Sequence, residues 1–182
     1  MSQERGSGFS RTISPFDEPR LSLCAGLMSE TMNLLEFLDA GAINLNLNGN
    51  DKESILSELV DILIGKGLVK SKPTLVASLI EREALGSTGI GHGVAIPHGR
   101  SNDLNNTVMA MGRSRQDVNF DAIDGQPTRL FFLLVAPENG TTQYLHVLAR
   151  IARLMKNETN RRLLLEAESP EQVLEMIKKT EG

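Results

Sequence analysis

Apolar and polar positions alternate along the chain with two different periods from residue 32 onward. Apolar residues at helical spacing predict amphipathic helices, whereas strict alternation or a short continuous apolar run predicts strands. Helical patterns are found over residues 32–39, 51–65, 73–86 and 141–156, and in segments that begin at Glu158 and Pro170. Strand patterns are found over residues 42–47, 93–97, 107–114 and 129–137. Helices that alternate with strands predict a single α/β domain.

Several of these segments carry more specific expectations. Asp51 is placed to cap the second helix, and Gly65 and Gly67 are placed to end it. The continuous apolar run 129–137 is typical of a central strand. Residues 116–126 are expected to connect two strands. The fourth helix is expected to bury one face made of Leu145, Leu148, Ile151, Ala152 and Met155.

The N-terminal part of the chain differs in character from the rest. Residues 1–20 hold glycine, serine, proline and charged residues with few apolar ones, which is typical of disorder. The pattern becomes periodic only near Met32. We therefore expect residues 1–31 to be disordered or an upstream N-terminal extension, with Met28 or Met32 as a natural start. Residues 32–182 are expected to form the domain.

Composition narrows the class of protein. The chain has 182 residues, of which 40% are hydrophobic, enough for a sizeable core. A net charge of -4 with both signs interspersed argues against a nucleic-acid surface. A single cysteine, Cys24, favours a reducing compartment. No apolar run approaches the roughly 20 residues of a membrane helix, and the N-terminus lacks the apolar core of a signal peptide. We expect a cytoplasmic protein.

Residues 87–99 (STGIGHGVAIPHG) are rich in glycine. Glycine lets main-chain N–H groups approach a ligand, and successive inward N–H groups bind anions. Ser87 and Thr88 add hydroxyl donors. The loop lacks the glycine of the dinucleotide fingerprint at Val94, and the Gly-Lys-Ser/Thr of nucleotide-triphosphate loops. The candidate phosphate-binding residues are Ser87, Thr88, Gly89, Gly91 and Gly93.

His98 is the candidate nucleophile. Pro97 favours an extended residue before it, so we expect a strand that ends here and presents the imidazole beside the glycine loop. A ring with a pKa near 6.5 is largely neutral and nucleophilic at neutral pH, and phosphohistidine can pass its phosphate onward. Arg82 precedes the loop, and a guanidinium suits phosphate oxygens. An arginine between two glutamates on a helix is also typical of a solvated surface.

The segment REALGSTGIGHGVAIPHG (82–99) resembles the signature of phosphotransferase-system enzyme IIA domains of the fructose and mannitol type. It is most similar to the free-standing nitrogen-regulatory branch. The resemblance continues through FDAIDGQP (120–127) and FFLLVAP (131–137), and covers roughly residues 33–180.

The resemblance implies a mixed β-sheet flanked by helices and a phosphotransferase component with a phosphohistidine intermediate. It implies that His98 is phosphorylated on its tele nitrogen, Nε2, and that Arg82 binds the phosphate. The donor would be a histidine phosphocarrier protein charged from phosphoenolpyruvate by an enzyme I, without a metal, nucleotide or other cofactor. Similar proteins act in nitrogen regulation and signal transduction, with potassium-transport components and sensor kinases among their partners.

One position departs from the family pattern. Such domains often carry a second histidine at the start of the helix after the central strand, and here Tyr144 stands there. His146 lies two residues on, which in a helix is a turn of about 200°. We therefore assign a possible role to Tyr144, whose hydroxyl can donate a hydrogen bond to phosphohistidine, and none to His146.

Other classes of function stay open. The family also includes sugar-specific IIA components of fructose and mannitol uptake. A binding module would hold a phosphorylated ligand without chemistry. A hydrolase would use Ser87 as nucleophile, His98 as base, and Asp121 or Asp124 to orient the base, but the sequence lacks a Gly-x-Ser-x-Gly elbow. A metal site made of the chain's three histidines has no standard zinc spacing. His92 is expected to be an exposed loop residue.

Overall fold

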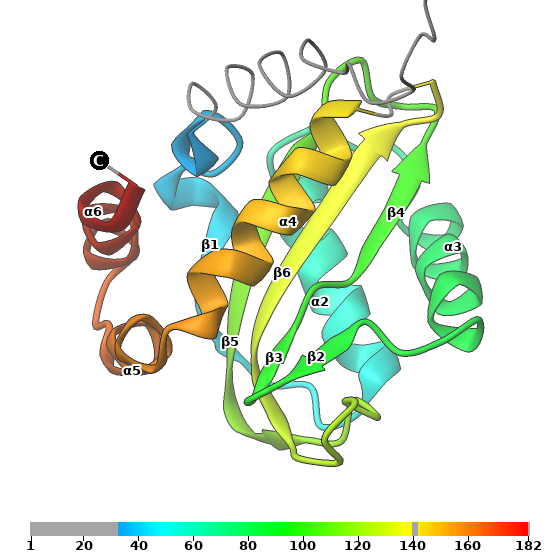
Figure 1. The fold of residues 1–182 in the computed structure, drawn as a ribbon. Helices are drawn as coiled ribbons and strands as arrows, with labels where there is room; N and C mark the ends of the chain where they lie inside the picture. Colours follow the sequence, from blue (N-terminus) through cyan, green and yellow to red (C-terminus); the bar gives the residue numbers. More distant parts are fainter. Residues whose placement is uncertain (1–32, 140–141, 182) are drawn as a thin grey trace, which may run out of the picture. The chain divides into compact units, whose positions relative to one another are not determined.

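A six-stranded mixed sheet forms the centre of the residues that the computed structural model describes, 33–139 and 142–181 (Figure 1). Its strands are β1 (Ile43–Leu47), β2 (Gly89–Gly91), β3 (Val94–Ala95), β4 (His98–Ser101), β5 (Val108–Val118) and β6 (Thr128–Pro137). Their order is β1-β5-β6-β3-β2, and β4 also pairs with β6. β1 is parallel to β5, β5 is antiparallel to β6, and β3 and β4 are parallel to β6.

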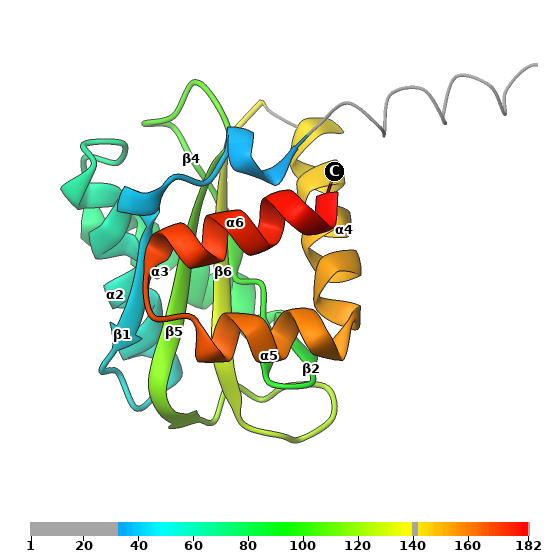
Figure 2. The ribbon, with the colours of Figure 1, turned by 90° about the vertical axis from the view of Figure 1, so that its left-hand side faces the viewer.

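Helices cover both faces of this sheet. They are α2 (Lys52–Gly65), α3 (Lys72–Ala84), α4 (Thr142–Lys156), α5 (Glu158–Glu166) and α6 (Pro170–Glu181). α2 and α3 lie on one face, and α4, α5 and α6 lie on the other (Figures 1 and 2). The expected α/β domain with a mixed sheet flanked by helices is confirmed.

The expectations for residues 1–31, including disorder and an alternative start, lie outside the described residues. In the part of the chain that the structure describes, none of the helices is both long and apolar enough to span a membrane.

The local signals around α2 act as the sequence predicts. Asp51 caps the helix by accepting a hydrogen bond from the Ser54 N–H at 2.8 Å. Ile55, Leu59 and Leu63 are fully buried against the sheet side of the helix. Gly67 follows the end with φ of 67°, a left-handed conformation that glycine adopts without steric cost.

The short helix predicted over 32–39 is replaced by two 3-10 turns, η1 (Leu34–Glu36) and η2 (Ala40–Ala42). Asn33 caps the first turn, with the side chain of Glu36 closing the capping box. The carbonyl of Phe37 accepts a hydrogen bond from Met109 on β5 at 3.3 Å. Because this carbonyl is used by the sheet, it cannot continue a helix.

β6 is the buried central strand that its apolar run predicts. Every residue from Leu130 to Ala136 is buried. Phe131, Leu133 and Val135 belong to the core under α2 and α3, and the alternate residues point to the opposite face. β5 extends to Val118, four residues beyond its predicted end, so the connection to β6 covers 119–127 and not 116–126.

α4 buries a face that only partly matches the predicted one: Ile151 and Met155 are buried as predicted, but Leu145 is not. Leu145 is 60% exposed, while Tyr144 is 8% exposed. The ring of Tyr144 contacts the ring of His98, which fixes the rotation of the helix about its axis. The predicted face is made of aliphatic residues only, so it leaves out the buried ring of Tyr144. The buried side chains are Tyr144, Val147, Ile151, Leu154 and Met155.

Candidate active site

His98 opens a strand, and the prediction that a strand ends there is wrong. Ala95 pairs with Phe131 and His98 with Leu134, so β3 and β4 continue one register along β6. Pro97, which has no N–H to donate, lies in the gap between them. Its carbonyl still accepts from the Leu134 N–H at 3.0 Å. The imidazole is therefore held by the central strand of the sheet rather than by a loop edge.

The two ring nitrogens of His98 have different partners. Nδ1 lies 2.8 Å from the carbonyl oxygen of Ile96. A carbonyl can only accept, so Nδ1 carries the proton of the neutral ring. Nε2 then holds the lone pair and accepts a hydrogen bond from Nε of Arg82 at 3.2 Å. Nε2 is thus the nitrogen that can act as the nucleophile, and it faces the guanidinium of Arg82.

The pKa of His98 is lowered from its ordinary value of 6.5. Burial of the half-buried ring is the main cause, and the positive charge of Arg82 lowers it further. The hydrogen bond to Ile96 and the negative charge of Glu83 act in the opposite direction. The ring is consequently neutral at physiological pH, and its Nε2 lone pair accepts the hydrogen bond from Arg82.

Arg82 reaches His98 from the last turn of α3. Its Nη1 donates to the carbonyl of Gly86 at 3.0 Å, which fixes the guanidinium from the loop side. Gly86 has φ of 148°, outside the range that other residues favour, so the turn that carries this carbonyl suits glycine. The structure therefore places Arg82 against the predicted nucleophile and not on a solvated face.

Tyr144 covers the other side of the imidazole. The two ring centroids are 5.9 Å apart and the planes meet at 69°, an edge-to-face contact. Burial raises the pKa of the Tyr144 phenol, so its hydroxyl stays protonated. The guanidinium of Arg100 lies over the face of the same ring, 5.8 Å from its centroid. Sequence reasoning did not single out Arg100.

An open cavity of about 380 Å³ adjoins these groups. Two arginines face it, Arg82 and Arg100, together with Glu138 at its exposed edge. Its lining residues are Ser78, Arg82, His98, Gly99, Arg100, Glu138 and Tyr144. Gly99 allows α3 to pack closely here, because a Cβ at this position would come within 3.0 Å of the Leu79 side chain.

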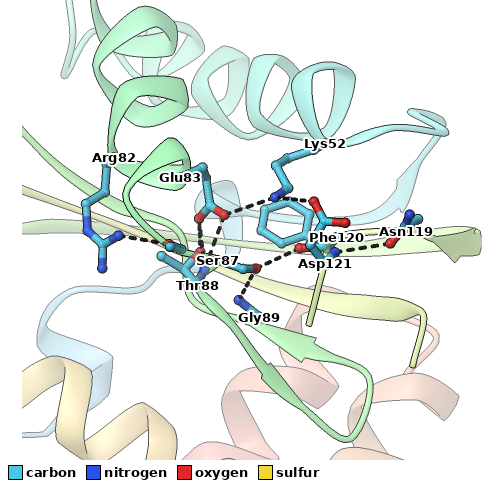
Figure 3. A network of polar contacts seen from close by, with 10 residues as sticks. Lys52, Arg82, Glu83, Ser87, Thr88, Gly89, Asn119, Phe120 and Asp121 are labelled. Carbon is cyan, nitrogen blue, oxygen red and sulfur yellow. Dashed lines mark hydrogen bonds and ion pairs between the residues drawn. The ribbon is translucent and has the colours of Figure 1, made fainter. Parts of the chain in front are cut away.

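The predicted hydroxyl donors are used elsewhere (Figure 3). Thr88 donates through its hydroxyl and, at 3.2 Å, its N–H to the buried carboxylate of Glu83. Lys52 pairs with the same carboxylate at 3.4 Å. Ser87 donates its hydroxyl to the carbonyl of Phe120 at 2.7 Å. These contacts fix the segment between α3 and β2, and neither hydroxyl lines the cavity beside His98.

The glycine-rich segment forms the hairpin of β2 and β3. Gly91, His92 and Gly93 all have positive φ, which the tight turn requires. The N–H of His92 donates to Asp124 at 2.7 Å, and the carbonyl of Gly93 accepts from Leu130 at 3.0 Å. The structure does not bring this hairpin, including Gly89 of β2, to the cavity beside His98.

The other histidines and the hydrolase arrangement lie apart from this site. His92 and His146 are exposed, and neither is among the groups that shift the pKa of His98. Asp121 pairs with Lys52 at 2.9 Å. Ser87 and Asp124 are hydrogen-bonded to main chain elsewhere, and neither lines the cavity beside His98, so the structure does not support the hydrolase alternative. Within residues 33–139 and 142–181, no cluster of three or more metal-ligating side chains occurs.

Comparison with known proteins decides the family. Residues 36–180 match the sequence model of the phosphoenolpyruvate-dependent sugar phosphotransferase system, EIIA 2. The chain belongs to this family. The expected resemblance is thereby confirmed, as is the more general prediction of a phosphotransfer component.

Two relatives illustrate the range of this EIIA 2 family. The chain is 34% identical over 155 residues to a nitrogen regulatory protein of Escherichia coli K12, a match that covers 84% of this chain and 93% of the relative. It is 35% identical over 146 residues to the fructose-specific EIIABC component of Bacillus subtilis 168, covering 80% of this chain and only 23% of the relative.

A solved structure agrees in fold. The crystal structure of nitrogen regulatory protein IIA-Ntr from Neisseria meningitidis superposes with a TM-score of 0.73 at 34% identity. The match covers 83% of this chain and 99% of that one. The EIIA chain therefore has relatives of known fold on the nitrogen-regulatory branch, as the sequence predicts.

Proposed function

We propose that this EIIA chain is a phosphoryl carrier that accepts phosphate on Nε2 of His98. The observation that carries the proposal is the pairing of the two ring nitrogens, Nδ1 with the Ile96 carbonyl and Nε2 with Arg82. The first contact leaves the lone pair on Nε2. The second puts a cation beside the atom that attacks phosphorus.

The transfer is one bond exchange. The lone pair of Nε2 on neutral His98 attacks the phosphorus of a phosphohistidine on the donor, and a new P–N bond forms. The P–N bond to the donor breaks, and its electron pair returns to the donor ring. The Nδ1 proton of His98 stays hydrogen-bonded to Ile96 throughout. No net proton transfer is needed, which suits a carrier that must work in both directions.

Arg82 and Tyr144 assist this step in different ways. Arg82 exchanges its bond to Nε2 for bonds to phosphoryl oxygens as the phosphate arrives, while Gly86 keeps the guanidinium in place. Tyr144 shields one side of the imidazole from water and holds the ring in its orientation. The phosphate-binding role predicted for Ser87, Thr88 and the glycines stays a prediction, and their internal hydrogen bonds favour Arg82 and the adjoining cavity instead.

The proposed donor is a histidine phosphocarrier protein charged from phosphoenolpyruvate by an enzyme I, in the cytoplasm. We assign the carrier domain to residues 32–182 and treat residues 1–31 as an extension. A regulatory role is supported by near-complete coverage of the E. coli nitrogen regulatory relative. Phosphorylation adds about −1.5 to −2 charges at neutral pH and so selects among protein targets. Potassium-transport components or sensor kinases are the targets we propose.

The proposal is tested by incubating the chain with phosphoenolpyruvate, enzyme I and the phosphocarrier, followed by intact-mass measurement. We expect one added phosphate that is lost in acid and does not form on a folded His98→Ala variant. His92→Ala serves as the matched control and should still gain the phosphate. A binding module without chemistry would gain none in any variant.

A second candidate, sugar uptake, is favoured by the fructose-specific relative. The two roles differ in where the phosphate goes. A phosphorylated sugar-specific IIA would pass its phosphate rapidly to a fructose-type IIB domain. In the regulatory role we expect slow or undetectable transfer to that domain, measured by loss of phosphate from His98.

A further inference from the structure

Arg100 lines the same cavity as His98 and Arg82. It follows His98 by two residues on β4. Because side chains alternate along a strand, residues two apart point to the same face of the sheet. Both residues line the cavity of about 380 Å³, with Arg82 entering from α3. Two guanidinium groups thus border the cavity that adjoins His98.

The guanidinium of Arg100 is held in place before any ligand arrives. Its Nη1 donates to the carbonyl of Glu138, and to that of Pro137 at 3.4 Å. Its planar group lies over the face of Tyr144, 5.8 Å from the ring centroid. An arginine over an aromatic face gains a cation–π attraction, and the fixed geometry lowers the entropy lost on binding.

Tyr144 contacts both the candidate nucleophile and the second arginine. Its ring meets the ring of His98 in an edge-to-face contact, and Arg100 lies over its face. One ring thus contacts both the nucleophile and the second cation. This arrangement gives a physical reason for a tyrosine where many family members carry a histidine, since the phenol ring is a better cation–π platform than an imidazole that can itself become charged.

The net positive charge of the cavity lining favours a phosphoryl anion. Arg82 and Arg100 contribute two positive charges, and the exposed Glu138 contributes one negative charge at the edge. Phosphate monoesters and phosphoramidates carry up to two negative charges at neutral pH. Guanidinium groups on two sides can hold different phosphoryl oxygens at once, which one arginine cannot do with the same geometric control.

We propose that Arg100 is a second phosphate-binding residue, which holds an oxygen of the phosphoryl group on His98, and that the ring of Tyr144 positions it. The inference rests on the proposed carrier function and adds a residue to it. It concerns how the phosphoryl group is held during transfer, while the bond exchange at Nε2 is unchanged.

The test compares Arg100→Gln with Arg153→Gln, which removes the same charge from an exposed position on α4. Phosphate acceptance from the phosphocarrier is measured by rapid quench. We expect Arg100→Gln to slow acceptance by at least about tenfold, and Arg153→Gln to leave it unchanged. Titration with inorganic phosphate, followed by the ring NMR signals of His98, should show about tenfold weaker binding in Arg100→Gln only.

The positioning role of Tyr144 has its own readout. Tyr144→Leu removes the aromatic face and should slow acceptance, and Arg100→Gln added to it should slow acceptance little further, because both changes disable the same contact. Tyr144→Phe retains the face and should keep Arg100 effective. Fully multiplicative effects of Tyr144→Leu and Arg100→Gln would overturn the positioning role.

The outcomes separate the two proposals. If the wild-type chain gains no phosphate on His98, both fail. If it gains phosphate and Arg100→Gln behaves like Arg153→Gln in both assays, only the role of Arg100 fails. Should Arg100→Gln be unfolded by circular dichroism, Arg100→Lys decides, since it keeps the charge but loses the planar fork: slower acceptance supports the assignment and a wild-type rate overturns it.

Discussion

Nε of Arg82 lies 3.2 Å from Nε2 of His98, although 16 residues separate them in the sequence. The contact joins the last turn of α3 to the first residue of β4. It places the guanidinium of Arg82 at Nε2, the nitrogen that holds the lone pair. The carbonyl of Gly86 holds that guanidinium through a second hydrogen bond. The pairing of Arg82 with His98 favours the neutral imidazole and marks the position that we propose for the phosphoryl group.

Replacing Arg82 by glutamine should slow phosphate acceptance by about 10- to 100-fold, as expected for loss of a hydrogen bond to a charged group worth roughly 1.5–3 kcal/mol. It should also raise the pKa of His98, because a positive neighbour that lowers it is removed. Rapid-quench kinetics and NMR titration of the ring measure the two effects. Arg115→Gln, an exposed charge on β5, is the control; equal rates in the two variants would refute the role of Arg82.

Stability should depend on pH through His98. Burial lowers its native pKa below the ordinary value of 6.5, so between the native pKa and about pH 6.5 the unfolded chain binds more protons than the native one. The free energy of unfolding should therefore fall as the pH drops through this window. The His98→Gln variant should lose less unfolding free energy over the same pH range. Urea unfolding across this range measures it, and parallel pH curves for the two proteins would contradict the prediction.

Thr88→Val should destabilise the domain by about 2 kcal/mol, within the range for removing one partner of a buried polar group. The buried carboxylate of Glu83 loses the hydroxyl donor drawn in Figure 3 and keeps only the Thr88 N–H and Lys52. Chemical denaturation gives the value. Thr159→Val at an exposed site on α5 should change stability by less than about 0.5 kcal/mol; a similar loss at both sites would show that the Glu83 contact contributes nothing.

Tyr144→His should fold and accept phosphate. An imidazole retains an aromatic edge toward His98, and position 144 is at the first turn of α4, where the change leaves the remaining buried face intact. Circular dichroism and the mass assay check the two expectations. Loss of folding would mean that the packing of α4 depends on the phenol itself.

The sequence predicts most elements because their signals are local. Asp51 and Gly67 bound α2, and the apolar run 129–137 becomes β6. The failures involve distant partners. The Phe37 carbonyl accepts a hydrogen bond from Met109 on β5, and the exposure of Leu145 accompanies the contact of Tyr144 with His98 on β4.

In the candidate site, too, local features are predictable from the sequence and contacts with distant residues are not. His98 and Arg82 are recognisable from residue type, spacing and the family resemblance. The partners of Ser87 and Thr88 are not, because Phe120 lies 33 residues away and Glu83 acts as an internal acceptor. Arg100 could have been found from the sequence if a strand had been predicted to begin at His98. Side chains alternate along a strand, so Arg100, two residues later, points to the same face of the sheet as His98.

The most direct measurement is the location of the phosphate on the imidazole. Chain labelled with 15N at histidine is phosphorylated from phosphoenolpyruvate through enzyme I and the phosphocarrier, and the P–N coupling is read by NMR. The account predicts one phosphorus bonded to Nε2 of His98, with Nδ1 still carrying its proton toward the Ile96 carbonyl. Phosphorus on Nδ1, on another histidine, or on no histidine would contradict it.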